Sequence, residues 1–195
     1  MSFRDLTACL PDWVEGFLAD PDRVYASTEA RMRLVVELSR LNVEHGTGGP
    51  FGAGVFETET GRLVAPGVNR VVPANCSIAH AEILAIAIAQ QKLQSYDLGS
   101  EGMPAHELVT STEPCAMCLG AIVWSGVRGL VCGAREEDAQ RVGFDEGPKL
   151  PDWVGALEQR GIAVTRDVLR EEARAVLVSY KETGGPVYNG RKSTR

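Results

Sequence analysis

The sequence lacks a long apolar run and any excess of basic residues. The apolar stretch "ILAIAIA" at residues 83–89 is far shorter than the roughly 20 residues that a membrane-spanning helix needs, so we expect no membrane segment. The chain has 20 lysines and arginines against 26 aspartates and glutamates, which gives a net charge of −6. Proteins that bind nucleic acids usually gather basic side chains into a patch. The charge balance therefore argues against a nucleic-acid partner and favours a small neutral ligand.

Cysteines are few and odd in number: Cys9, Cys76, Cys115, Cys118 and Cys132. The first residues, "MSFRDLTACLPDW", also lack the apolar core of a secretory signal. Together these features predict a cytoplasmic chain with reduced thiols rather than a disulfide framework. In such a chain a C-x-x-C pair is more often part of metal or redox chemistry than a structural disulfide.

Helical and extended patterns alternate along most of the chain, which is 44% hydrophobic. We expect helices at residues 29–44, 80–95, 115–124, 135–142, 154–160 and 170–183, and strands at 51–57, 62–71, 107–112, 129–134 and 162–168. This alternation predicts an α/β fold, a three-layer α/β/α sandwich around a five-stranded mixed sheet. Residues 1–28 are expected to form an irregular N-terminal extension with a short helix near 12–19, residues 29–183 the folded domain, and residues 184–195 a C-terminal tail.

Two short stretches, "HAE" at residues 80–82 and "PCAMC" at residues 114–118, combine residue types that bind metals and move protons. Cys115 and Cys118 can reach one metal ion from a single turn, and His80 would be the third ligand. Three protein ligands leave the fourth position of a tetrahedral zinc ion open, which is typical of a catalytic site. All three residues lie at predicted helix starts, whose partial positive charge favours thiolates.

Glu82 follows His80 by two residues and is placed to move protons. It can take a proton from a zinc-activated water and pass it to a substrate. The combined pattern, H-x-E followed by P-C-x-x-C, is the signature of zinc deaminases. Each part alone has a simpler interpretation: a redox pair for the cysteines, an ordinary helix-start residue for His80, and a dipole-stabilised acid for Glu82. Cys76 is a minor candidate for a further ligand, and Cys9 and Cys132 are interpreted as loop or core thiols.

From about Glu29 to Glu182 the sequence resembles the cytidine/deoxycytidylate deaminase superfamily. "HAEILA" and "STEPCAMCLGAI" would suit two of its branches, the tRNA adenosine deaminases and the bacterial guanine deaminases. The resemblance is closest to guanine deaminases, through "GGPFGA" at residues 48–53, "NRVV" at 69–72, "AIVWSG" at 121–126 and "GFDEGP" at 143–148. It implies a zinc-dependent hydrolytic deaminase that converts guanine to xanthine and ammonia.

The resemblance also implies roles for residues outside the zinc motif. Asn69 would hydrogen-bond the O6/N7 edge of the purine, and the backbone N–H of Ala81 would assist. Phe51 and Trp124 would form aromatic walls around the planar ring. The family implies a homodimer whose C-terminal segments are exchanged, and Tyr188 is the best candidate to enter the partner's pocket from that segment.

Glu146, in "GFDEGP", is implied as a second acid of the site. Guanine presents its N1–H and its 2-amino group side by side, and one carboxylate accepts both hydrogen bonds. Cytosine and adenine present a bare acceptor nitrogen beside the amine, where an ionised carboxylate would be mismatched. Two acids therefore favour a guanine-like substrate. The simpler interpretation of Glu146 is a solvated loop charge beside Asp145.

Several alternatives stay open on the sequence alone. A tRNA adenosine deaminase or a cytidine/deoxycytidylate deaminase would use the same fold and zinc motif. A non-catalytic zinc-binding module is a third alternative, although an open fourth position argues against it. Because aminotriazines such as ammeline mimic the six-membered ring of guanine, they are candidates for a side activity.

Overall fold

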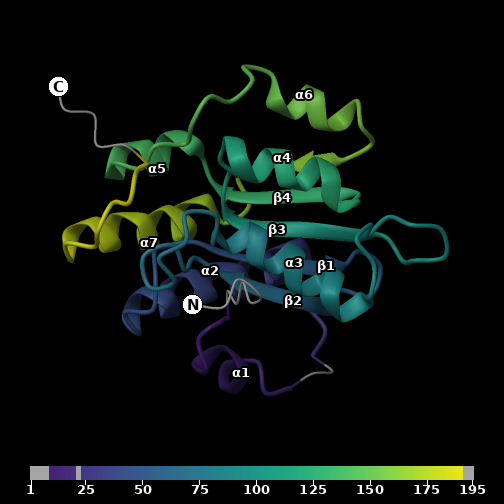
Figure 1. Ribbon diagram of the computed structural model, residues 1–195, viewed down its shortest axis with the longest axis horizontal. Helices are drawn as coiled ribbons and strands as arrows, with labels where there is room; N and C mark the ends of the chain where they lie inside the picture. Colours follow the sequence, from purple (N-terminus) through teal and green to yellow (C-terminus); the bar gives the residue numbers. More distant parts are fainter. Residues whose placement is uncertain (1–8, 21–22, 191–195) are drawn as a thin grey trace, which may run out of the picture.

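The computed structural model describes residues 9–20 and 23–190, which fold around one five-stranded mixed sheet (Figure 1). The strands are β1 (Gly52–Glu57), β2 (Leu63–Val68), β3 (His106–Thr112), β4 (Gly129–Ala134) and β5 (Ala163–Thr165). Their order across the sheet is β2-β1-β3-β4-β5. β1 pairs antiparallel with both β2 and β3, whereas β3, β4 and β5 are parallel. The predicted five-stranded mixed sheet is therefore confirmed.

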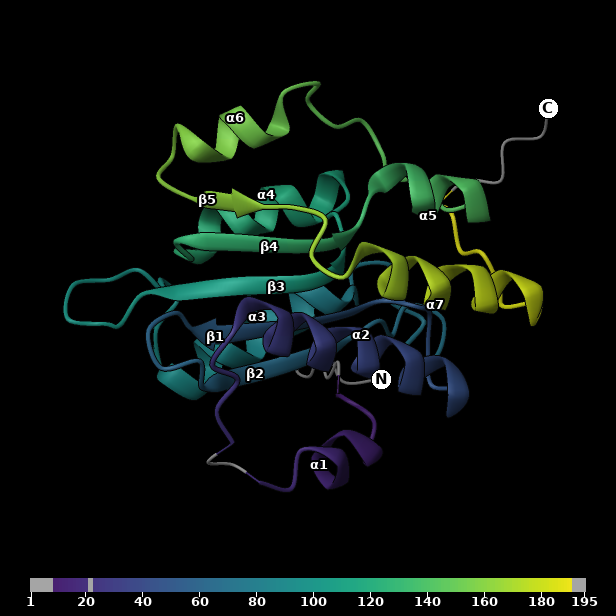
Figure 2. The same cartoon turned by 180° about the vertical axis from the view of Figure 1, so that it is seen from behind.

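Helices cover both faces of this sheet. They are α1 (Trp13–Phe17), α2 (Thr28–Glu44), α3 (Ala81–Leu93), α4 (Ala116–Ser125), α5 (Glu136–Val142), α6 (Trp153–Glu158) and α7 (Arg170–Glu182). α3 and α4 lie in front of the sheet in Figure 1, and α2 and α7 lie on the opposite face, which is seen in Figure 2. The three-layer α/β/α fold class predicted from the sequence is confirmed.

The strands β3 and β4 lie in the middle of the sheet and are buried along almost their whole length. Every residue of β3 is buried, and so are the last five residues of β4. β4 fits the rule that strands covered on both faces tend to be apolar throughout, whereas β3 also buries polar residues such as His106 and Glu107. β5 is shorter than the predicted strand at 162–168, because only three of its residues pair with β4 at the edge of the sheet.

Within the N-terminal extension, residues 1–8 and 21–22 lie outside the described residues, and the described part contains the expected short helix as α1. α1 and the residues beside it pack against the domain through Val14, which is only 2% exposed. Val14 belongs to a buried cluster that also contains Phe56 of β1 and Leu38 of α2. The described part of the extension thus adds to the core.

The sheet brings the starts of α3 and α4 together at the carboxyl ends of β2 and β3. Because β2 and β3 are both antiparallel to β1, they run in the same direction and end on the same side. α4 begins soon after β3, and α3 follows β2 through the loop at residues 69–80. Gly67 lets α3 approach closely, since a Cβ there would lie 2.1 Å from the carbonyl oxygen of Ala81. In the described part of the chain, no helix is both long and apolar enough to span a bilayer.

Candidate functional site

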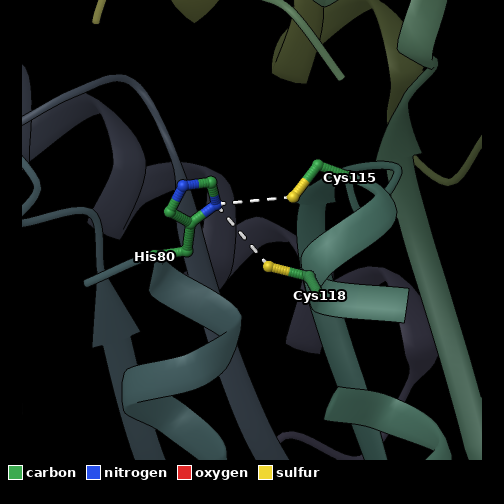
Figure 3. Close-up of side chains that lie close together, drawn as sticks. All are labelled: His80, Cys115 and Cys118. Atoms are coloured by element: carbon green, nitrogen blue, oxygen red, sulfur yellow. Dashed lines mark hydrogen bonds between the residues drawn. The ribbon is translucent and has the colours of Figure 1, made fainter. Parts of the chain in front are cut away.

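His80, Cys115 and Cys118 meet at the edge where α3 and α4 begin (Figure 3). His80 immediately precedes α3, Cys115 immediately precedes α4, and Cys118 lies in the first turn of α4. Nδ1 of His80 is 3.6 Å from Sγ of Cys115 and 3.6 Å from Sγ of Cys118. In a tetrahedral zinc site with Zn–S near 2.3 Å and Zn–N near 2.0–2.1 Å, the nitrogen–sulfur separation is also ~3.6 Å. The three donors therefore fit a zinc ion.

The charges of the two thiols also point to a cation. The hydrogen bond from the Cys118 thiol lowers the pKa of Cys115 to about 4, and His80 adds to the effect. The neighbouring Cys115 sulfur and burial in turn raise the pKa of Cys118. Without a cation the pair thus shares one proton, whereas a divalent metal ion favours two thiolates. In the described residues no fourth His, Cys, Asp or Glu joins the group, so a tetrahedral ion would keep one position open.

Two buried carboxylates, those of Glu82 and Glu146, line the cavity beside these donors. Each residue is 6% exposed. Burial raises the pKa of Glu82 to about 6, with a further contribution from Cys115. Burial raises the pKa of Glu146 to about 8, and the charges of Cys115 and Glu82 act in the same direction. Paired acids with raised pKa values beside a metal-binding group are typical of active sites.

The cavity has a volume of about 680 Å³, enough for a heterocyclic base and ordered water. Phe51, Phe144 and Tyr188 supply aromatic surface to its wall. The Phe144 ring is in edge contact with Phe51 at 4.9 Å and with Tyr188 at 5.2 Å between centroids. Phe51 and Tyr188 were singled out from the sequence, whereas Phe144 was overlooked although it belongs to the "GFDEGP" stretch.

Tyr188 reaches the cavity of its own chain. The tail is held there by Asn189, whose Oδ1 accepts a hydrogen bond from the backbone N–H of Asp145 at 2.9 Å. Nδ2 of Asn189 donates to the carbonyl oxygen of Gly143 at 3.0 Å. The expected exchange of this segment with a partner is therefore not needed to place Tyr188 at the cavity.

The other three predicted site residues, Asn69, Ala81 and Trp124, differ in where they lie relative to the cavity. Asn69 is 1% exposed at the end of β2, and its Oδ1 accepts a hydrogen bond from the N–H of Val71, which lines the cavity. Ala81 is the first residue of α3, so its N–H is not used within the helix. Trp124 does not line the cavity: it is 83% exposed on α4. The expectation that Trp124 walls the ring pocket is corrected, because helical spacing points its indole away from the sheet and the site.

One wall of the cavity comes from the loop between β2 and α3. It contains Val71, Val72, Asn75, Cys76 and Ser77. Cys76 borders the cavity but is outside the three-donor group. The sequence pointed to this wall through the "NRVV" stretch at residues 69–72 and through Cys76, which lies four residues before His80.

Glu113 also borders the cavity, yet its carboxylate is already paired. Oε1 accepts a hydrogen bond from Nε of Arg166 at 2.6 Å. Oε2 accepts one from the N–H of Glu136 at 3.1 Å, where α5 begins. These contacts give Glu113 a structural place between β3, α5 and the segment after β5.

Comparison with known proteins agrees with this geometry. Residues 26–134 match the family described as the cytidine and deoxycytidylate deaminase zinc-binding region. The chain belongs to this deaminase family. The matched range contains His80, Glu82, Cys115 and Cys118, so these deaminase residues are the ones that the fold brings together. As a family member, the protein is a zinc-dependent aminohydrolase.

Individual relatives within this deaminase family differ in their similarity to the chain. A guanine deaminase from Bacillus subtilis is 39% identical over 143 residues, which are 73% of this chain and 87% of the relative. A tRNA-specific adenosine deaminase from Buchnera aphidicola is 30% identical over 131 residues, 67% of this chain and 79% of the relative. A solved structure of guanine deaminase from Nitrosomonas europaea is 52% identical with a TM-score of 0.86, over 91% of this chain and 97% of the other. The resemblance to guanine deaminases seen in the sequence is thus confirmed.

Proposed function

We propose that the protein catalyses the hydrolytic deamination of guanine to xanthine and ammonia. The observation that carries the proposal is the second buried carboxylate, Glu146, in the same cavity as Glu82 and the three zinc donors. The similarity to guanine deaminases from Bacillus subtilis and Nitrosomonas europaea supports it.

Glu146 selects the substrate through the hydrogen-bond acceptors that its carboxylate offers. In its ionised form the carboxylate accepts hydrogen bonds from N1–H and the 2-amino group of guanine, which lie side by side, and these two donors lower its raised pKa when guanine binds. The backbone of this residue is fixed, because its carbonyl oxygen accepts the N–H of Ala116 at 2.9 Å. Adenine and cytosine would place a lone pair against the carboxylate, and a buried mismatch of this kind costs about 1–3 kcal/mol.

Glu82 carries the protons of the reaction. When bound, zinc supplies Lewis-acid chemistry that lowers the pKa of a water molecule to near neutrality. The carboxylate of Glu82 takes a proton from the attacking water and delivers it to N3 of the purine. A C2–O bond forms. Glu82 then takes the proton of the new C2 hydroxyl group and passes it to the 2-amino group, the C2–N bond breaks, and ammonia leaves as the C2 carbonyl of xanthine forms. The raised pKa of Glu82 suits a group that both accepts and releases protons near neutral pH.

The remaining cavity residues hold the base and exclude water. Phe51, Phe144 and Tyr188 line the cavity and pack against a planar ring. Asn69 is buried at the end of β2, behind the lining residue Val71, and is proposed to face the O6/N7 edge of the ring. The N–H of Ala81, free at the start of α3, is proposed as a further donor.

A homodimer is the proposed assembly, formed through the outward face of α4. α4 contains no charged residue, and Gly120 and Trp124 are exposed one turn apart on it. A helix that is apolar on all sides is usually buried, so a second copy would cover this face. Because Tyr188 lies in its own chain's cavity, the proposed dimer does not depend on an exchanged tail.

A cytoplasmic location is proposed as well. None of the five cysteines forms a disulfide, which supports this location.

An ammonia-release assay on zinc-loaded protein tests the proposed reaction. The panel contains guanine, guanosine, cytosine, cytidine, adenine, adenosine and ammeline. We expect guanine to give the highest kcat/KM and ammeline to give slower, measurable turnover. Higher kcat/KM on cytidine or adenosine would contradict the proposal.

A filter-binding assay with tRNA tests the alternative that the protein is a tRNA adenosine deaminase. With a net charge of −6, the protein is expected to show no saturable binding of tRNA at physiological salt. Saturable binding together with adenosine deamination in the tRNA would show that the substrate is an RNA rather than guanine.

A further inference from the structure

Asn42, near the end of α2, makes three hydrogen bonds inside the protein. It is fully buried. Its Nδ2 donates to the carbonyl oxygens of Gly49 and Asn69, both at 2.9 Å. Its Oδ1 accepts the hydroxyl of Thr47 at 2.8 Å. One amide side chain thus joins the loop after α2 to the end of β2.

Both chain segments held by Asn42 lead directly to the cavity wall. On one side, the carbonyl of Gly49 also accepts the N–H of Phe51 at 2.9 Å, and Phe51 lines the cavity. On the other side, the side chain of Asn69 accepts the N–H of Val71, another lining residue. The amide of Asn42 therefore sets the spacing between two parts of the wall without touching the cavity.

The packing around this amide leaves little freedom. A Cβ at Gly48 would lie 1.8 Å from the carbonyl oxygen of Asn69 and 2.6 Å from Nδ2 of Asn42. A Cβ at Gly49 would lie 2.3 Å from the hydroxyl of Tyr188. The loop is thus wedged between Asn69 and the C-terminal tail, so a shift of the loop is transmitted to both.

The N-terminal extension continues the same hydrogen-bond chain. Nε1 of Trp13 donates to the hydroxyl of Thr47 at 3.0 Å, and its ring stacks on His45 with centroids 5.1 Å apart. In the series Trp13, Thr47, Asn42, each side chain donates a hydrogen bond to the next, and Asn42 donates to the backbone of Gly49 and Asn69. Hydrogen bonds aligned in this way polarise and strengthen one another. α1 lies outside residues 26–134, the range that matches the deaminase family.

We propose that Asn42 is a positioning residue for the purine-binding wall, and that Trp13 of the N-terminal extension supports it through Thr47. The inference rests on the proposed function for its substrate. It assigns a role to the extension: α1 holds the loop that fixes Phe51 and the segment from Asn69 to Val71. Zinc binding and proton transfer depend on other elements, so these functions should be independent of the chain Trp13–Thr47–Asn42.

A matched pair of variants at Thr47 tests the role. Thr47→Val keeps the shape and removes the hydroxyl, whereas Thr47→Ser keeps the hydroxyl. We expect the valine variant to raise KM for guanine about 5- to 10-fold with kcat changed less than about twofold, and the serine variant to resemble wild type. The dissociation constant of the product xanthine, measured by calorimetry, should rise in parallel, and zinc content should stay unchanged.

Trp13→Phe, which keeps a ring on His45 but has no N–H, should raise KM less than Thr47→Val does. Arg40→Ala, on the exposed face of α2, is the control and should leave KM unchanged. Equal KM values for Thr47→Val and Thr47→Ser would overturn the proposal, and so would a loss of kcat together with zinc.

Amide hydrogen exchange separates this inference from the proposed function. If wild type releases no ammonia from guanine, the proposed function fails, but the positioning role is still measurable. Thr47→Val should then speed exchange at residues 47–51 and 69–72 relative to Thr47→Ser. Unchanged exchange in both segments would reject the positioning role by itself.

Discussion

The backbone N–H of Ala116 donates a hydrogen bond to the carbonyl oxygen of Glu146 at 2.9 Å. Ala116 is the first residue of α4 and follows the zinc donor Cys115. The segment that carries the second acid is therefore attached to the helix start that carries the metal-binding thiols. This bond holds the backbone of Glu146 beside the metal-binding thiols.

Replacing Glu82 by Gln should abolish most turnover while zinc remains bound. The amide has nearly the same size, so packing at the start of α3 is kept, but it cannot accept a proton. We expect a loss of about 10²- to 10⁴-fold in kcat, the usual contribution of a general acid–base group. Ammonia release and metal content are measured on the same preparation. A variant with near wild-type kcat would remove Glu82 from proton transfer.

Glu146→Gln should impair guanine deamination more than folding. Gln accepts only one of the two hydrogen bonds from guanine and turns an N–H donor toward the other. We expect kcat/KM to fall at least about tenfold. Glu158→Gln, an exposed position on α6, is the matched control and should be neutral. Wild-type kcat/KM in the Glu146 variant would show that this acid does not contact substrate.

Removing one thiolate should release the metal. Cys118→Ser replaces a soft zinc ligand by a weakly coordinating hydroxyl, so we expect substoichiometric zinc and loss of activity. Cys76→Ser is the control: this thiol borders the cavity but lies outside the donor group, so zinc content should stay at one per chain. Equal zinc content in the two variants would contradict the ligand assignment.

Asp138 should give the protein a pH-dependent stability. Burial alone would raise its pKa, but the hydrogen bonds from Arg170 and the N–H of Arg135 outweigh burial and lower the pKa below the usual 3.8. A lowered folded-state pKa stabilises the fold above the unfolded value, and this stabilisation is lost as pH falls through the folded value. Asp138→Asn should lower the unfolding free energy by about 1.5–3 kcal/mol at pH 7.

The difference between Asp138→Asn and wild type should shrink as urea unfolding is repeated from pH 7 down to pH 3. Glu171→Gln, an exposed acid paired with Arg174, is the control and should change stability by less than about 1 kcal/mol. An Asp138→Asn difference that stays constant with pH would show that its carboxylate charge is not the cause.

Trp124→Glu should convert the proposed dimer to a monomer. The charge would stand on the apolar outward face of α4, where a second copy is expected to pack. Sedimentation velocity measures the change. Val24→Glu, at a 54% exposed apolar position beside Arg62 on the β2 side, is the control and should leave the mass unchanged. A wild-type protein that is monomeric at all concentrations would reject the dimer itself.

Features that depend on local pattern were predictable from the sequence. The bounds of β4 agree with the expected strand at 129–134, because apolar residues and flanking glycines define it locally. His80, Glu82, Cys115 and Cys118 were found for a similar reason: their spacing alone carries the chemistry, and each pair lies within one turn of a helix.

Features that depend on contacts between distant residues were not predictable. The resemblance assigned Trp124 to the cavity, and only the packing of α4 on the sheet shows that its indole faces outward. Asn42 has no motif, and its role arises only when β2 brings Asn69 beside it, 27 positions away in the sequence. Likewise, nothing in the composition of the tail shows that Asn189 bonds to Gly143 of its own chain.

The three zinc donors come from parts of the chain that the unfolded polypeptide keeps apart. His80 and Cys115 are 35 positions apart in the sequence. An ion held by both binds only the folded chain, so its binding free energy adds to the free energy of unfolding. Chains that have not yet acquired metal would then be both inactive and easier to unfold, so proteases that clear loosened chains would enrich the population in the metal-loaded enzyme.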